Sequence, residues 1–498
     1  MKLNYQPSPS LRAKQSTASI MKDLTLCLLA VTVYAVIYYS NTFGSAYGLR
    51  VVLLMLDAIV TALVTEAVFF KVMKKDIKTG LKSSYGWVTA MIIVLITDIS
   101  MSYYAVCVAT VIAIVFGKLV FGGFGQNIFN PAAFGEAIIM NSFAASKSTD
   151  FVTGATPTIA AKGAGWIFDS AQLAKLVEPY SGLGGMFVGQ YPSTIGSTCA
   201  LLLILCAIFL IVRKDIDWQT PVFYVGSVFV IALIVGAMHG ASIDYAIFHV
   251  LAGGVLFGGI FMATDPVTTP VSLGGRVIYA VAAASLTMII RTKSNLSDGV
   301  LYAILLMNML TPAIESMMDG NQIKDAKKLR NKTIITSLIF VAMAVGVGAT
   351  LQHKEVVAEE KTDAKETKTV EIVLSDAFEE NAVKVEEVSN DGKVAVYDCT
   401  AKGFGLIDPD GMATASGHEY ERNEATITIN LETMTVESIE VTSFGDTAGF
   451  GDKATKPEAL ATYEGKGIDD SVDGVSQATY TSTSIASMVH AALDAAQQ

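Results

Sequence analysis

Long apolar runs separated by short polar segments fill roughly the first 350 residues of the chain. A helix needs about twenty apolar residues to cross a bilayer. Ten runs approach this length, and an eleventh, weaker run contains a glutamate. The ten are Leu24–Ser40, Val51–Phe70, Trp87–Thr97, Tyr103–Val120, Ile195–Val212, Pro221–Met238, Ala246–Met262, Val277–Ile290, Val300–Leu310 and Ile334–Leu351, and the weaker one is Ala132–Ala145. The pattern predicts an α-helical polytopic membrane protein with about 10–11 transmembrane helices.

The pattern near the C-terminal end is that of a water-soluble domain. Ala425–Leu431 alternates between apolar and polar residues, which predicts a strand, and Val436–Phe444 can pair with it through a four-residue turn. Apolar residues then recur at helical spacing from Ile485 to Ala496. We therefore expect a small α+β domain that ends in a helix.

These patterns divide the chain into four parts. Residues 1–320 form the membrane domain, and residues 321–353 form a cytoplasmic connection and the final transmembrane helix. Residues 354–370 are a charged, Ala- and Thr-rich linker, and residues 371–498 form the soluble domain.

Composition supports this division. Of the 498 residues, 52% are hydrophobic and 16% are charged, and the mean hydropathy of +0.49 is that of a membrane protein. Residues 353–498 carry 11 basic and 29 acidic residues, whereas the first 352 carry 24 basic and 17 acidic residues. A basic membrane part is thus followed by an acidic soluble part, and this balance argues against nucleic acid as a partner.

Clusters of Lys and Arg predict the orientation, because they favour the cytoplasmic side. They occur at residues 12–22, 71–82, 213–214 and 324–332. All four are cytoplasmic if Ala132–Ala145 also crosses, with the N-terminus inside and the C-terminus outside. The loop at 147–192 and the acidic domain then face the outer side of a bacterial inner membrane. The first ten crossings form two sets of five in opposite orientation, as in inverted-repeat transporters.

Ionisable residues at membrane depth are candidates for an ion or flavin cavity. Asp57 and Glu66 lie nine residues apart in one apolar run, and we expect them on one face of its helix. Glu136 lies in the weak run, and Asp265 lies in the Pro-interrupted segment 264–270. The five cysteines show no spacing typical of metal ligands, so we expect no metal site.

Two seven-residue stretches more than three hundred residues apart share one pattern. Residues 150–156 read DFVTGAT and residues 473–479 read DGVSQAT. The shared positions are Asp150, Thr153, Ala155 and Thr156 in the first stretch, and Asp473, Ser476, Ala478 and Thr479 in the second; Gly154 is replaced by Gln477. A small-residue loop that ends in an accessible hydroxyl suits the attachment of a bulky group by another enzyme.

The second stretch lies close to the C-terminal helix. Thr481, Ser482 and Thr483 are competent N-caps for that helix. We therefore expect Thr479 just ahead of the helix N-terminus, where free N–H groups and the helix dipole favour a phosphate.

Both stretches resemble the Asp-x-x-(Ser/Thr)-Gly-Ala-Thr signal of Rnf and sodium-pumping NADH:quinone reductase complexes. A flavin transferase links FMN through its phosphate to the final threonine of that signal. Residues 118–132 (KLVFGGFGQNIFNPA), 249–254 (HVLAGG), 261–270 (FMATDPVTTP) and 299–308 (GVLYAILLMN) resemble RnfD, a membrane protein of the Rnf complex. From Arg330 onward the chain resembles RnfG, and residues 444–451 (FGDTAGFG) are similar to the Glu-Thr-Pro-Gly-x-Gly turn of its FMN-binding domain.

The resemblance implies a membrane electron-carrier subunit without a complete active site of its own. It implies covalent FMN on Thr156 and Thr479, and a non-covalent riboflavin in the RnfD-like part. Electrons would pass between reduced ferredoxin and NAD, coupled to Na⁺ or H⁺ translocation. The implied partners are the other Rnf subunits (RnfA, RnfB, RnfC and RnfE), the flavin transferase and the lipid bilayer; whether the complex also contains a separate RnfG is left open.

Two alternatives stay open. The first is an NqrB-like part of a sodium-pumping NADH:quinone reductase. The second is a solute channel or transporter without a redox role, which leaves both threonine signals unexplained.

Overall fold

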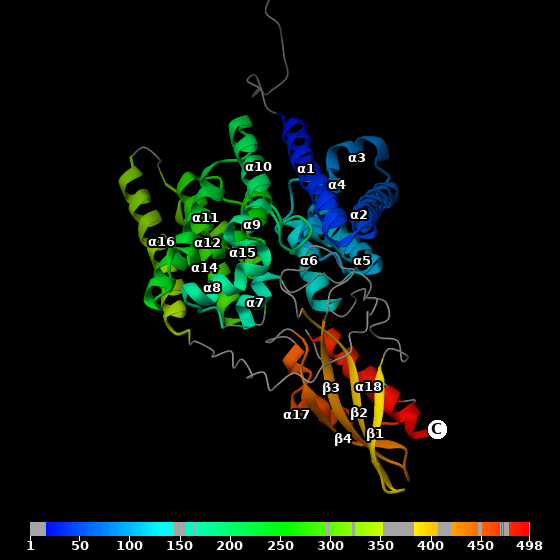
Figure 1. The fold of residues 1–498 in the computed structure, drawn as a ribbon. Helices are drawn as coiled ribbons and strands as arrows, with labels where there is room; N and C mark the ends of the chain where they lie inside the picture. Colours follow the sequence, from blue (N-terminus) through cyan, green and yellow to red (C-terminus); the bar gives the residue numbers. More distant parts are fainter. Residues whose placement is uncertain are drawn as a thin grey trace, which may run out of the picture.

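The computed structural model of this protein contains a helical bundle and a small sheet domain (Figure 1). It describes residues 16–143, 151, 156–163, 165–294, 296, 298–320, 324–351, 383–406, 420–446, 451–468, 470, 472 and 478–497.

The first half of the bundle begins with a long helical hairpin. Ser16 caps the first helix through Ser19 N–H, and Gly44, at φ +103°, turns the chain into the second. The helices of this half are α1 (Thr17–Phe43), α2 (Ser45–Val72), α3 (Ile77–Ser84), α4 (Gly86–Ile96), α5 (Tyr103–Ile114) with the π-helix η1 (Val115–Leu119), and α6 (Pro131–Ser142). The axes of α3 and α4 are bent by 44°, so the third predicted run, Trp87–Thr97, forms one arm of a bent helix pair.

Four short helices lie between the two halves of the bundle. They are α7 (Pro157–Gly163), α8 (Ser170–Val177), η2 (Glu178–Tyr180) and α9 (Gly182–Val188). Asp169 and Gln172 form a capping box at the start of α8.

The second half contains a second broken span. Its helices are α10 (Ala200–Arg213), α11 (Gln219–Met238), α12 (Ile243–Leu251), α13 (Val255–Phe257) with the π-helix η3 (Gly258–Met262), α14 (Leu273–Lys293), α15 (Val300–Met317) and α16 (Ala326–Ala349). The break between α12 and α13 bends the path by 65°. Predicted run Ala246–Met262 is therefore not one straight helix, and run Ile195–Val212 becomes helical only from Ala200.

Every predicted apolar run contains helix, but only some of the helices are long enough to cross a membrane. Within the described residues, six helices are long and apolar enough to cross a membrane, or up to eight if each bent pair forms one span. Residues 103–119 and α10 are shorter apolar helices. The prediction of a multi-pass α-helical membrane protein is confirmed among the described residues.

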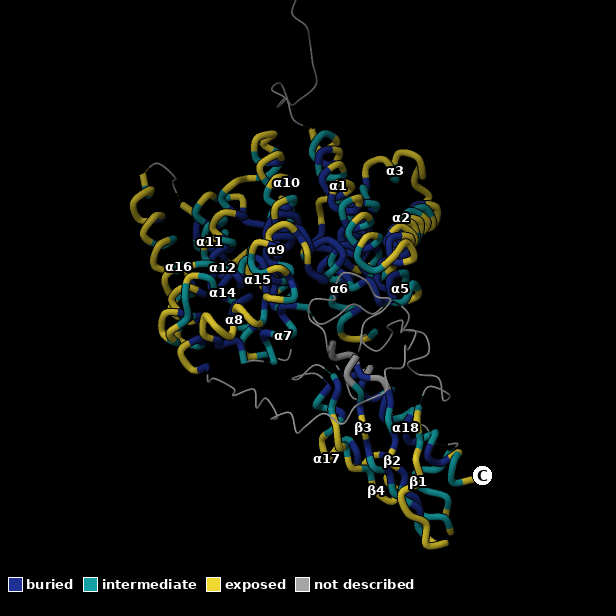
Figure 2. Tube along the Cα trace, viewed as in Figure 1, coloured by how far each residue is buried: buried dark blue, intermediate teal, exposed yellow. Residues whose placement is uncertain are grey.

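Burial and charge follow the expected arrangement of a bilayer protein. Figure 2 shows buried residues toward the middle of the bundle and exposed residues along α2 and α16. In Figure 1, α3, the start of α1 and the start of α16 lie at one end of the bundle, while α7 and α8 lie at the other. The basic clusters are adjacent to α1, α3, α10 and α16, whereas Thr156, which ends the first of the two similar stretches, precedes α7.

The C-terminal domain is a four-stranded antiparallel sheet in the order β1-β2-β3-β4, with one long helix packed on it. Its elements are β1 (Lys384–Asn390), β2 (Val394–Leu406), β3 (Tyr420–Asn430), β4 (Thr435–Ser443), η7 (Gly451–Lys453), α17 (Pro457–Leu460), η8 (Ala461–Tyr463) and α18 (Thr479–Gln497). The predicted pairing of the last two strands is confirmed, with Ile427 opposite Ile439.

The apolar positions predicted on the last helix form much of the domain core. Ile485, Met488 and Leu493 of α18 are buried against Tyr397 and Ile427 in one cluster. One expectation is wrong by a few residues: α18 begins at Thr479 itself, so the three expected caps lie within its first turns. The linker at 354–370 lies outside the described residues.

Candidate functional site

The first threonine signal ends where α7 begins. Thr156 is half-buried, its Oγ1 lies 3.0 Å from Thr158 Oγ1, and Ile159 N–H donates to it at 3.4 Å. The hydroxyl therefore lies at the boundary between the protein interior and its surroundings. Asp150, Thr153, Gly154 and Ala155 lie outside the described residues.

A buried arginine contacts the same signal at Phe151. The Arg50 guanidinium lies 4.2 Å from the centroid of the Phe151 ring, and the Tyr47 ring is 5.1 Å away from it. Arg50 also donates from Nε to Ile99 O at 2.7 Å and from Nη2 to Met101 O at 2.8 Å. The start of the signal is thus held against the break between α4 and α5.

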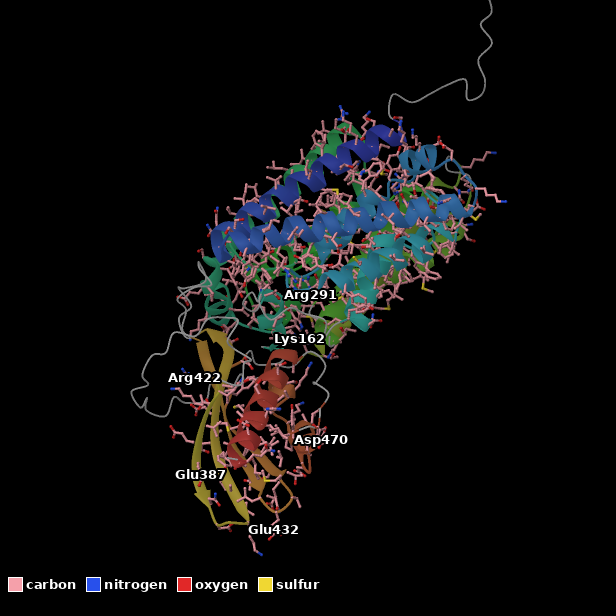
Figure 3. The ribbon with its side chains drawn as sticks, turned by 90° about the vertical axis from the view of Figure 1, so that its right-hand side faces the viewer. Lys162, Arg291, Glu387, Arg422, Glu432 and Asp470 are labelled. Atoms are coloured by element: carbon pink, nitrogen blue, oxygen red, sulfur yellow. The ribbon has the colours of Figure 1, made fainter. Side chains whose placement is uncertain are left out.

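Behind α7, a second buried arginine closes the break between α12 and α13. Arg291 Nη1 donates to His249 O at 2.8 Å, and Nη2 donates to Ala252 O at 3.1 Å and to Asp298 Oδ1 at 3.0 Å. The carbonyls left free by the broken helix are thereby satisfied, as membrane-depth backbone requires. A Cβ on Gly253 would be 3.0 Å from Thr158 Cγ2, so α7 packs directly on this break. Figure 3 shows Arg291 and Lys162 at this end of the bundle.

The same break contacts aromatic side chains. Trp166 stacks on the buried His249 at 5.5 Å, and Tyr245 Oη donates to Trp166 O at 2.7 Å. His249 therefore packs among aromatic rings, as a buried helix-end histidine would.

In the C-terminal domain, a buried network surrounds the start of α18. Asn423 of β3 donates to Asp446 Oδ2 at 3.0 Å and to Ser484 Oγ at 3.1 Å, and it accepts from Gly445 N–H at 2.9 Å. Thr481 Oγ1 donates to Asp446 Oδ2 at 2.6 Å. The turn that resembles an FMN-binding turn is thus tied to the first turns of the helix that starts at Thr479.

Close packing between the turn at Gly451 and the start of α18 leaves little room for a side chain. A Cβ on Gly451 would lie 2.4 Å from Thr481 Oγ1, so glycine is required there for the approach of the turn to α18. Ala478 is buried, while Asp473, Ser476 and Gln477 lie outside the described residues. Sequence reasoning identified Asp446 and Thr479 but missed Asn423 and Ser484, because no local motif marks them.

A pocket of about 90 Å³ opens between the two halves of the bundle. Its polar lining includes Lys118, Asn127 and Asn130 from the first half, and Thr264 and Asp265 from the second. Asn130 holds its position by capping α6 at Ala132 N–H and Ala133 N–H, and its own N–H donates to Asn308 Oδ1 at 2.9 Å.

The four carboxylates singled out at membrane depth lie in separate surroundings. Glu66 is fully buried, 3.0 Å from Lys118 Nζ, and Ser84 Oγ donates to it. Asp265 accepts from Val267 N–H at 3.1 Å, and Thr97 Oγ1 donates to Glu136 at 2.6 Å. Asp57 is half-buried beside a cysteine of α5.

The expectation that Asp57 and Glu66 share one face of α2 is wrong. At 3.6 residues per turn, nine residues correspond to two and a half turns, which places the two side chains on opposite sides. Across the described ranges, no group of three or more His, Cys, Asp or Glu side chains is placed to hold a metal ion.

Two family models match the two parts of the chain. The model described as the NQR2, RnfD, RnfE family matches residues 4–324, and the model described as the FMN-binding domain matches residues 422–494. The second match contains the network of Asn423, Asp446 and Ser484.

Curated relatives resemble the membrane part. The D subunit of the proton-translocating ferredoxin:NAD(+) oxidoreductase complex of Clostridium ljungdahlii is 34% identical over 321 residues, which are 62% of this chain and 92% of the relative. The D subunit of the Na(+)-translocating ferredoxin:NAD(+) oxidoreductase complex of Acetobacterium woodii is 34% identical over 322 residues, with 63% and 93% covered. The D subunit of the ion-translocating oxidoreductase complex of Halorhodospira halophila is 28% identical, with 62% and 91% covered.

Proposed function

Because this chain belongs to the NQR2, RnfD, RnfE family, we propose that it is a natural fusion of an RnfD-like membrane part with an RnfG-like FMN-binding domain. In this role it carries electrons within an Rnf-type complex that couples transfer between reduced ferredoxin and NAD to ion translocation. The observation that carries the proposal is the presence of both matched domains on one chain, each with a threonine signal. A transporter without a redox role would need neither the FMN-binding domain nor the signals.

The two threonines would hold FMN as phosphate esters. Each ester forms between the threonine Oγ and the FMN phosphate, with the loss of one water relative to free FMN and the free hydroxyl. Thr156 suits this role because its hydroxyl is half-buried at the start of α7. At Thr479, the network of Asn423 and Asp446 orders the adjoining turn, which supports a fixed flavin position. Bound FMN would supply one-electron steps.

The pocket between the halves would be the site of the non-covalent riboflavin, because polar side chains and an apolar wall line it together. The amides of Asn127 and Asn130 and the hydroxyl of Thr264 would offer the donors and acceptors that a flavin ring requires, beside the apolar wall that includes Phe124 and Phe261. Lys118 lines the same pocket, and its positive charge is balanced by the carboxylate of Glu66.

Orientation and partners follow from the same proposal. The basic clusters would be cytoplasmic, and Thr156 and the C-terminal domain would face the outer side of a bacterial inner membrane. RnfA, RnfB, RnfC and RnfE would supply the other redox centres, and a flavin transferase would complete the chain. For the translocated ion, Asp265 and Glu66 are the stronger candidates because they lie in or beside the pocket. The ion is left open as Na⁺ or H⁺, since relatives of equal identity are named for each.

Flavin fluorescence of the denatured protein in a gel tests the covalent attachment. The wild-type chain, made together with its transferase, should fluoresce, and mass spectrometry should locate an FMN ester on each signal peptide. Thr156→Val should remove one ester and Thr479→Val the other, while Thr158→Val, which removes the neighbouring hydroxyl, should retain both. A colourless wild-type chain of unmodified mass would contradict the proposal.

A further inference from the structure

One carboxylate of the bundle lies where a lipid-facing residue is expected. Asp57 is 12 residues after Ser45 and 15 residues before Val72, at the middle of α2. At a rise of about 1.5 Å per residue it is ~18 Å from the outer end of the helix, deep within the hydrocarbon region. Its neighbours on the helix surface are outward-facing: Leu53, Leu56 and Val60 are 43%, 53% and 56% exposed.

The contacts of Asp57 within the chain are few and weak. Cys107 Sγ of α5 donates to Asp57 Oδ2 at 3.0 Å, and Thr61 Oγ1 lies 3.3 Å from the same sulfur. A thiol is a poor donor. Among the described side chains and backbone groups, no donor reaches the second oxygen, Oδ1, and the residue as a whole is half-buried.

A lipid chain cannot complete this arrangement. Hydrocarbon offers no hydrogen-bond donor, and a carboxylate at the middle of a bilayer is costly unless it faces protein or water. Apolar surface around a single polar residue is a common arrangement at interfaces between transmembrane helices, where packing and one interhelical hydrogen bond hold the pair together.

We propose that the surface formed by Leu53, Leu56, Asp57 and Val60 of α2 with Cys107 and Val111 of α5, the Asp57 face, docks a transmembrane helix of another membrane subunit of the same complex. That helix presents a hydrogen-bond donor or a cationic side chain to Asp57 Oδ1. The proposal rests on assembly into a complex, as the relatives are named, but not on flavin attachment.

The native thiol of Cys107 provides a first test. Cys107 is half-buried on the Asp57 face, whereas the other four cysteines are buried. A lipid-soluble carbene probe, which is activated by light and does not need an ionised thiol, should label Cys107 in membranes that contain this chain alone. Co-expression of the whole complex should lower the labelling rate at least about fivefold, because a helix packs over the thiol. Cys107→Ser identifies the signal, and equal labelling rates in the two membranes would overturn the proposal and indicate lipid.

Substitution of Asp57 provides the second test. With an affinity-tagged partner subunit, Asp57→Leu should lower the recovery of this chain about tenfold, and Asp57→Asn should lower it less because an amide oxygen still accepts. Val230→Leu, at an exposed apolar position of α11, is the matched control and should not change recovery. Wild-type recovery of Asp57→Leu would overturn the proposal.

Flavin fluorescence separates this proposal from the proposed function. A fluorescent Asp57→Leu chain that no longer co-purifies supports docking, whereas a non-fluorescent wild-type chain contradicts only the flavin assignment. Should Asp57→Leu fail to accumulate in the membrane, the Cys107 labelling of the wild-type complex decides the question.

Discussion

Replacing Asn423 by alanine should destabilise the C-terminal domain and loosen its flavin site. Asn423 is almost fully buried, and it makes three hydrogen bonds: to Asp446 Oδ2, to Ser484 Oγ and from Gly445 N–H. Alanine removes all three without adding a clash. The buried Gly445 N–H then loses its partner, and Asp446 retains Thr481 as its donor.

The magnitude follows from those partners. A hydrogen bond to a charged group contributes about 1.5–3 kcal/mol, and an orphaned buried N–H costs about 1–3 kcal/mol. The three bonds belong to one network and do not add fully, so we expect a loss of about 3 kcal/mol. A domain of this size has a total stability of about 5–15 kcal/mol, so the variant should still fold.

Urea unfolding of residues 354–498, followed by circular dichroism, measures this loss, because the domain has a core cluster separate from that of the bundle. Asn430→Ala is the matched control in the same strand. Asn430 caps an exposed turn by accepting from Glu432 N–H and Thr433 N–H, so its loss should cost less than about 1 kcal/mol. Equal losses for the two variants, or an Asn423→Ala domain as stable as wild type, would refute the reasoning. In the full chain, Asn423→Ala should also reduce the covalent flavin at Thr479 relative to Thr156.

Three further changes have definite expected outcomes. Arg291→Met should cost about 3–5 kcal/mol, because it removes the cation that pairs with Asp298, which keeps only the Gly254 N–H as a donor, and it leaves two carbonyls without their donor; a melting temperature in detergent equal to that of wild type would contradict this. Burial raises the pKa of the Cys399 thiol to about 12, so iodoacetamide at pH 8 should alkylate it only after the domain unfolds. The folded-state pKa of Cys399 lies above the unfolded value of about 9, so the stability gained by burying the neutral thiol is present below pH 9 and is lost as the pH rises toward 12. A domain that is equally stable at pH 8 and pH 11 would contradict this expectation. Gly451→Ala places a Cβ 2.4 Å from Thr481 Oγ1 and should cost about 1–3 kcal/mol by urea unfolding, whereas no change would show that the turn can move away.

Local periodicity predicted much of the fold. Each apolar run contains helix, the strand pair around Ile427 and Ile439 is present, and the apolar face of α18 is buried. Prediction failed where a helix is interrupted and the interruption is stabilised by a residue distant in the sequence. The break at Ala252–Gly254 depends on Arg291, 39 residues away, to satisfy the freed carbonyl of Ala252, and apolar periodicity carries no signal of such a partner.

Part of the candidate site could likewise be predicted from the sequence, and part could not. The two threonine signals were recognisable because repeated residue types at equal offsets are visible in the sequence alone. The network of Asn423, Asp446 and Ser484 was not recognisable, because its members come from a strand, a turn and a helix that share no sequence spacing. The pocket likewise combines residues 118–132 with residues 261–267.

By itself, the sequence determined the class of the protein, its two parts and the acidic character of the C-terminal domain, and it contains the repeated motif that predicts modified threonines. These properties depend on the solubility of side chains and on chemistry confined to a few neighbouring residues. Only the tertiary structure decided which buried charges are paired and how the broken helices are completed. Those outcomes depend on contacts between segments distant in sequence, where a buried polar group is stable only if folding brings it a partner.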